Sequence, residues 1–176
     1  MKKEYEVEGL YKVIDLVKFR ETPGVRFDIL PKEVLMKSEG VDRVIHESHA
    51  QSPGPVGNIE RPWYMHTHQS DHLMVLHGKR YVELYSTSHG KIESFVVEPN
   101  KIYKNGELLC DYPAILSWPR EVFHRIISKE EGSASINFAY RYEGLDPKSN
   151  FSIYDLNTNT KTYKVIREGH KDQFVD

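Results

Sequence analysis

The sequence predicts an all-β protein, an antiparallel sandwich or small barrel with few short helices. Polar and apolar side chains alternate over residues 79–85 and again over 91–97, which is the period of a half-buried strand. Asn105-Gly106 lies between two apolar runs and is a strong hairpin signal, because both residues tolerate positive φ. Helix signals are few, and the best candidate is the short segment 31–37. Short strands at this spacing favour stacked or closed antiparallel sheets.

Further strands are expected near both ends of this pattern. Residues 114–118 and 135–140 combine β-branched and aromatic side chains, as strands do. The last part of the chain predicts a hairpin, with strands near 151–154 and 162–166 and polar turn residues between them. Such a hairpin either covers an edge of the barrel or pairs with a second subunit.

Composition narrows the class of protein. A chain of 176 residues suits one domain with a sizeable core. Its 24 basic and 26 acidic residues give a net charge of -2 with no basic block, so no nucleic-acid partner is expected. The single cysteine, Cys110, excludes an intrachain disulfide and suits a reducing compartment. No signal peptide and no apolar run of ~20 residues is present, so we expect a cytoplasmic protein without membrane association.

Histidines gather in one short segment. Residues 66–72 read His-Thr-His-Gln-Ser-Asp-His, and a further histidine, His124, follows in a later strand candidate. If the segment is extended, His66 and His68 project to the same side, since side chains alternate along a strand. Two imidazoles held side by side are half of a divalent-metal site. Neutral imidazole suits transition metals better than Mg²⁺ or Ca²⁺.

These residues resemble a known family. His66-x-His68, an apolar strand ending at Gly78, and Pro119-x-x-x-x-His124 together resemble the two signature motifs of the cupin superfamily. The resemblance implies a double-stranded β-helix, a jelly-roll barrel that holds a metal on its motif strands. It predicts a single domain over the whole chain, divided into N-terminal strands and loop, core and C-terminal hairpin extension at 1–42, about 43–142 and 143–176.

The resemblance also implies a ligand set. The glutamate of the first motif is absent, and the position that it would occupy, counted back from Gly78, holds Asp71. A four-histidine version of the motif instead points to His72. The expected ligands of one divalent transition metal (Fe, Mn, Ni, Cu or Zn) are therefore His66, His68, His72 and His124, with Asp71 as the competitor of His72.

Three functions fit this site. The first is a metalloenzyme for a small polar metabolite, of oxygenase (oxidoreductase) or isomerase/epimerase type, in which a nearby group such as Glu121 acts as acid or base. The second is non-catalytic binding of a small ligand, and the third is a structural metal site. An enzyme is favoured, because no DNA-binding or other output module is attached. Similar proteins are often dimers, so a homodimer is expected, with the C-terminal hairpin as the exchanged element.

Overall fold

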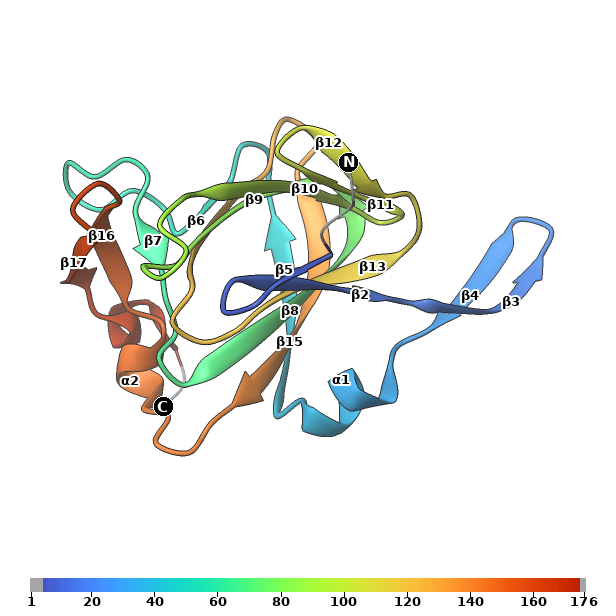
Figure 1. The fold of residues 1–176 in the computed structure, drawn as a ribbon, viewed down its shortest axis with the longest axis horizontal. Helices are drawn as coiled ribbons and strands as arrows, with labels where there is room; N and C mark the ends of the chain where they lie inside the picture. The colour runs from blue at the N-terminus through green and yellow to red at the C-terminus, as the bar shows by residue number, and fades with distance from the viewer. Residues whose placement is uncertain (1–4, 175–176) are drawn as a thin grey trace.

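Two antiparallel sheets enclose an apolar interior in the computed structural model, which describes residues 5–174 (Figure 1). The first sheet has six strands, in the order β1 (Glu6–Val7), β2 (Tyr11–Asp15), β13 (Ala114–Trp118), β8 (Gln69–Gly78), β15 (Ser133–Arg141) and β5 (Gly40–His46). The second runs β12 (Glu107–Cys110), β11 (Lys101–Lys104), β10 (Glu93–Glu98), β9 (Arg80–Tyr85), β14 (Phe123–Ile127), β7 (Trp63–Tyr64), β16 (Ile153–Asn157) and β17 (Thr162–Arg167), with β6 (Gln51–Ser52) beside β14. This jelly-roll barrel confirms the predicted fold class.

Local sequence signals place several elements as expected. Asn105 and Gly106 join β11 to β12 with φ values of 50° and 86°, which only such residues adopt cheaply. The predicted short helix is present as α1 (Lys32–Lys37). The strands predicted at 79–85 and 91–97 are β9 and β10, each displaced by no more than two residues. The turn residues and the alternation of polar and apolar side chains are therefore sufficient to predict this part of the barrel, from β9 to β12.

Apolar side chains from both sheets meet in one core cluster. Leu73 and Val75 of β8 pack in it with Val82 and Leu84 of β9. All four are at most 3% exposed. Because fully burying such a side chain contributes about 1.5–3 kcal/mol, this cluster fixes the inward faces of β8 and β9. Any polar residue that shares these faces is therefore held rigidly inside the barrel.

The C-terminal segment closes one side of the barrel. The predicted hairpin is present as β16 and β17, and β16 pairs with β7 of the same chain. It is preceded by α2 (Pro147–Asn150). Asp146 caps this helix, because its carboxylate accepts a hydrogen bond from the Lys148 amide at 3.1 Å. A short 3-10 helix, Gly169–Asp172, follows the hairpin.

The N-terminal part of the chain divides between the barrel and a separate hairpin. β1 and β2 join the six-stranded sheet, where β2 pairs with β13. The next two strands, β3 (Val17–Thr22) and β4 (Val25–Ile29), pair only with each other and extend away from the barrel (Figure 1). Among residues 5–174, no helix is long and apolar enough to cross a membrane.

Candidate active site

Three buried side chains converge inside the barrel: His66, Asp71 and His124. Their ligand atoms all lie within 4.8 Å of one another. Asp71 Oδ2 is 3.3 Å from His66 Nε2 and 3.8 Å from His124 Nε2. The three side chains are 5%, 3% and 5% exposed. Imidazole nitrogens and a carboxylate in such an arrangement can transfer protons or bind a metal ion.

Strand parity explains why Asp71, and not its neighbour His72, faces this group. Asp71 lies two residues before Leu73 on β8 and therefore shares the inward face of that strand. His124 lies opposite Leu84, so it also points inward. His72 points to the other face, where its Nδ1 hydrogen-bonds the Phe138 carbonyl at 3.0 Å.

The expected strand over His66 and His68 is absent, so these two histidines do not form a side-by-side pair. The chain bends at Thr67 and His68, and β8 begins only at Gln69. The Glu121 amide donates to the His66 carbonyl at 2.8 Å, and the Tyr142 amide donates to the His68 carbonyl at 2.9 Å. Two distant segments thus hold this connection in an irregular path. Alternation of side chains does not apply there.

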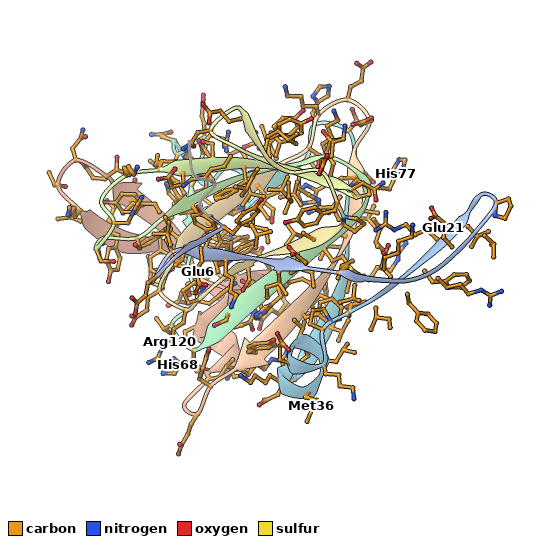
Figure 2. The ribbon with its side chains drawn as sticks, turned by 45° about the vertical axis from the view of Figure 1, so that its right-hand side comes forward. Glu6, Glu21, Met36, His68, His77 and Arg120 are labelled. Carbon is orange, nitrogen blue, oxygen red and sulfur yellow. The ribbon has the colours of Figure 1, made fainter. Side chains whose placement is uncertain are left out.

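The four predicted ligands therefore separate into two pairs. His66 and His124 come together, and Asp71 takes the third position in their group. His68 is half-buried, has Nδ1 2.9 Å from the Thr67 hydroxyl, and lies at the periphery of the molecule in Figure 2. Neither His68 nor His72 belongs to the group of possible ligands found among the described residues. Metal ligation itself stays a prediction.

Backbone carbonyls fix the tautomers of both inward histidines. His66 Nδ1 lies 2.5 Å from the Asn150 carbonyl oxygen, and His124 Nδ1 lies 3.1 Å from the Val122 carbonyl oxygen. A carbonyl only accepts hydrogen bonds, so each Nδ1 carries the hydrogen. The two Nε2 atoms are left to face Asp71 Oδ2. Nitrogen lone pairs would repel the carboxylate, so a proton or a cation must lie between at least one pair.

The carboxylate of Asp71 is oriented by amides. Its Oδ1 accepts hydrogen bonds from Gln69 Nε2 at 2.8 Å and from Asn137 Nδ2 at 3.0 Å. Gln69 in turn accepts from Asn150 Nδ2 at 3.1 Å. One oxygen is thus held by the scaffold, while the other is available to the two imidazoles. Sequence reasoning missed all three amides, because no spacing rule connects Asn137 and Asn150 to the histidine segment.

Burial and charge set the protonation of the group. Burial opposes the charged form of His66, but the charge of Asp71 and its hydrogen bond outweigh this effect and raise the pKa of His66. Burial likewise opposes ionisation of Asp71, yet the neighbouring His66 lowers the pKa of Asp71. Burial, followed by repulsion from His66, lowers the pKa of His124 to about 4. The carboxylate of Asp71 thus favours the charged form of His66, whereas burial and the charge of His66 favour the neutral form of His124.

Aromatic rings surround the group. Phe151 meets the His66 ring edge-on at a centroid distance of 5.0 Å, and Trp118 lies 5.1 Å from His124. Tyr64 lies 6.3 Å from the His66 ring and 6.0 Å from the His124 ring. These walls lower the local dielectric and strengthen the interactions of the charged pair. Glu121, a candidate acid or base, has an exposed side chain outside the group.

The donor set also fits a transition metal. Two imidazole nitrogens and one carboxylate oxygen suit such an ion, and each imidazole already donates its other N–H to a carbonyl, as metal-bound histidines usually do. If a metal binds here, His66, Asp71 and His124 would hold it. Three protein ligands leave positions open for a substrate.

Comparisons with known proteins place the fold in one structural neighbourhood. A dTDP-sugar isomerase from Desulfovibrio desulfuricans is 13% identical, with a TM-score of 0.56, over 78% of this chain and 82% of that chain. The RmlC epimerase of Mycobacterium tuberculosis is 11% identical, with a TM-score of 0.55, over 82% of this chain and 70% of the epimerase chain. The third is a variant of a sugar 3,4-ketoisomerase from Thermoanaerobacterium thermosaccharolyticum, bound to TDP-4-keto-6-deoxyglucose. It is 13% identical, with a TM-score of 0.53, over 78% of this chain and 83% of the ketoisomerase chain.

These neighbours belong to the cupin superfamily, in agreement with the fold expected from the histidine motifs. No protein-family model matches the chain, and no curated protein matches its sequence. At identities of 11–13%, the likeness to the three solved structures shows the fold alone.

Proposed function

We propose that this protein is an isomerase or epimerase of a small polar metabolite that carries a carbonyl group, with His66, Asp71 and His124 as its reactive centre. The observation that carries the proposal is the convergence of two imidazoles and one carboxylate in a buried site, where the pKa of His66 is raised and that of His124 is lowered. The names of the structural neighbours, which are sugar isomerases and an epimerase, support the same reaction class.

The geometry suits proton transfer next to a carbonyl. His124 Nε2 would accept a proton from the carbon beside the carbonyl, while the positive charge of the His66 imidazolium stabilises the negative charge that develops on the carbonyl oxygen. Return of the proton to the opposite face of the same carbon gives an epimer. Its return to the former carbonyl carbon gives an isomer, provided that the proton of the adjacent hydroxyl passes to the enolate oxygen, so that the carbonyl moves by one carbon. Asp71 would hold His66 in its charged form and proper orientation throughout.

A second candidate is the metal-dependent enzyme that the sequence suggested, with Asp71 in place of His68 and His72. It is favoured by the two Nδ1–carbonyl contacts, which leave both Nε2 atoms directed at one carboxylate oxygen. A bound divalent metal would supply Lewis acidity toward substrate oxygens. Its open positions would argue against a purely structural role.

Hydrogen exchange tests the proposed chemistry. The wild-type protein is incubated in D₂O with TDP-4-keto-6-deoxyglucose, the sugar bound by one structural neighbour, and the sugar is followed by mass spectrometry. We expect deuterium to enter at a carbon next to the carbonyl. His66→Gln and His124→Gln should slow this exchange about 100-fold or more, because the first removes the stabilising charge and the second removes the base. His77→Gln is the matched control, since His77 is exposed on β8, the strand that carries Asp71.

Exchange that is equally fast in His66→Gln and wild type would contradict the proposal. Metal dependence then separates the two candidates. Exchange that survives chelation and dialysis supports proton transfer by the side chains alone. Exchange that is lost and then restored by one added metal per chain supports the metal-dependent enzyme. In that case His124→Ala should abolish metal binding, whereas His68→Ala and His72→Ala should retain it.

A further inference from the structure

Arg80, the first residue of β9, is buried inside the barrel without a carboxylate partner. Its side chain is 1% exposed and points inward, since it shares the inner face of β9 with Val82 and Leu84. Its Nη2 donates a hydrogen bond to the Val44 carbonyl at 3.0 Å, whereas its Nε has no hydrogen-bond partner. Burial lowers the pKa of Arg80 to about 10, so the guanidinium stays charged at neutral pH, and no ion pair among residues 5–174 includes it.

The buried charge of Arg80 needs a counter-charge. An unpaired charge inside a protein is strongly unfavourable, because apolar groups replace the water that would solvate it. Fully buried arginines are therefore paired with an anionic group. The Val44 carbonyl supplies only a partial negative charge. Since no carboxylate of the described residues pairs with Arg80, the counter-charge has to come from a bound anion.

A second buried donor without a partner lies close to Arg80. Ser135 points inward, because it shares a face of β15 with Asn137, whose side chain reaches the candidate active site. In the register of the sheet, Ser135 lies opposite Val44, the residue whose carbonyl accepts from Arg80. Ser135 Oγ, like Arg80 Nε, is buried and has no hydrogen-bond partner. Two donors that have no partner thus converge on one part of the interior.

A buried imidazole and two further hydroxyl groups line the same end of the barrel. His46 Nδ1 lies 3.1 Å from Ser128 Oγ, which lies 2.6 Å from Ser133 Oγ. Burial, followed by repulsion from Arg80, lowers the pKa of His46 to about 4. His46 is therefore neutral near pH 7, and it neither balances nor adds to the charge of Arg80. Neutral hydroxyl and imidazole groups form a polar surrounding that suits an anion.

This group lies at the opposite end of the barrel from the candidate active site. Arg80 follows Gly78, the last residue of β8, whereas Asp71 lies near the first residue of that strand. The extended chain from Asp71 to Gly78 spans about 20 Å. Figure 2 shows His77, next to Gly78, and His68, just before β8, on opposite sides of the molecule. The Arg80 group is therefore a separate site.

We propose that this end of the barrel binds a small monovalent anion such as chloride, held by the Arg80 guanidinium and the Ser135 hydroxyl. The anion accepts hydrogen bonds from Arg80 Nε and Ser135 Oγ, the two donors without a partner. One negative charge balances one guanidinium, so a monovalent ion matches the site better than sulfate does. The ion has to be small, because both side chains are only 1% exposed. This site is independent of the reaction proposed above.

Thermal unfolding in two salts tests the site. Wild type is unfolded in about 2 mM and about 200 mM sodium chloride, with sodium gluconate added to keep the ionic strength constant. Gluconate is the reference anion because it is too large for a buried site. If half of the sites fill at about 10 mM chloride, the unfolding temperature should rise by about 5 °C. Equal unfolding temperatures in the two mixtures would overturn the proposal.

Three variants assign this effect to the site. Arg80→Met should abolish the rise, because it removes the charge and keeps a long side chain. Arg43→Met is the matched control and should keep the full rise, since Arg43 is exposed on β5. Ser135→Ala removes one hydroxyl and should need about 10-fold more chloride for the same rise, which decides the matter even if Arg80→Met does not fold. A rise that persists in Arg80→Met, or that is unchanged in Ser135→Ala, would contradict the assignment.

Bromide locates the ion directly. It replaces chloride and scatters anomalously, so crystals grown in sodium bromide should show an anomalous peak within hydrogen-bond distance of Arg80 Nε. The peak should be absent from crystals of Arg80→Met. An ordered water molecule at that position, with bromide bound only at exposed lysines, would show an adventitious ion only and would overturn the proposal.

Discussion

Replacing Asp71 with asparagine separates the charge of the site from its shape. At the observed 3.3 Å between Asp71 Oδ2 and His66 Nε2, the attraction between unit charges is about 5 kcal/mol for an effective dielectric constant of 20. Much of this attraction offsets the cost of burying the pair. Asparagine keeps an oxygen for the amides of Gln69 and Asn137, and its Nδ2–H can donate to the lone pair of a neutral His66.

We therefore expect Asp71→Asn to fold and to lose only about 1 kcal/mol of unfolding free energy, the scale of one rearranged hydrogen bond. Asp71→Leu should lose about 3–5 kcal/mol, because it breaks a buried pair and leaves two amide donors unsatisfied. Urea denaturation at pH 7 measures both losses. In Asp71→Asn, the negative charge that opposes the effect of burial on His66 is gone. The pKa of His66 should therefore fall from above its ordinary value to below it.

An NMR titration of the imidazole nitrogens follows that pKa, with His66→Gln used to assign the signal. A midpoint for His66 that is the same in wild type and Asp71→Asn would refute the reasoning, since it would show that the charge of Asp71 does not hold the proton. Equal stability losses in Asp71→Asn and Asp71→Leu would refute the assigned roles of the two carboxylate oxygens.

Two further predictions concern pH and backbone. The pKa of His124 is lowered to about 4, so the unfolded chain binds more protons than the folded one as pH falls below about 6.5, and His124 should cost about 3 kcal/mol of stability by pH 4. Urea denaturation at pH 7, 5 and 4 should show a loss that is smaller in His124→Gln, and parallel curves for the two proteins would contradict this assignment. Gly78 and Gly106 have φ values of 68° and 86°, but an added Cβ would overlap the Gly132 carbonyl only at Gly78. Gly106→Ala should therefore cost about 1 kcal/mol and Gly78→Ala about 3 kcal/mol or more, which thermal unfolding would detect, and similar losses would argue against the close approach to Gly132.

Local signals were enough to predict most of the barrel. Alternation over 79–85 and 91–97 follows from one buried and one solvent-facing side of each strand, and both segments are strands. The turn at Asn105-Gly106 needed no tertiary information, because its φ values depend on those two residues. The hairpin of β3 and β4 escaped prediction as a separate element, because alternation shows that a strand has an apolar face but not what covers it.

Two of the three residues of the candidate site followed from the sequence as well. His66 and His124 were singled out by their spacing in two motifs, and both reach the site. The prediction that placed His68 beside His66 depended on an extended chain through residue 66, whereas His72 followed from the four-histidine version of the motif. Backbone contacts from Glu121 and Tyr142 bend the chain at this point, so the parity of β8 starts anew at Gln69.

The sequence by itself determined several strands and their turns, because these depend on contacts within a few residues. It also singled out two inward histidines through their motifs. Tertiary structure alone decided that Asp71 completes the site and that Asn137 and Asn150 orient its members. These contacts join residues that are 66 to 84 positions apart in the sequence, on β8 and the segment before it, on β15 and on α2. The direction of a polar side chain depends on which face of the strand the core buries, and that is settled only when the sheets pack.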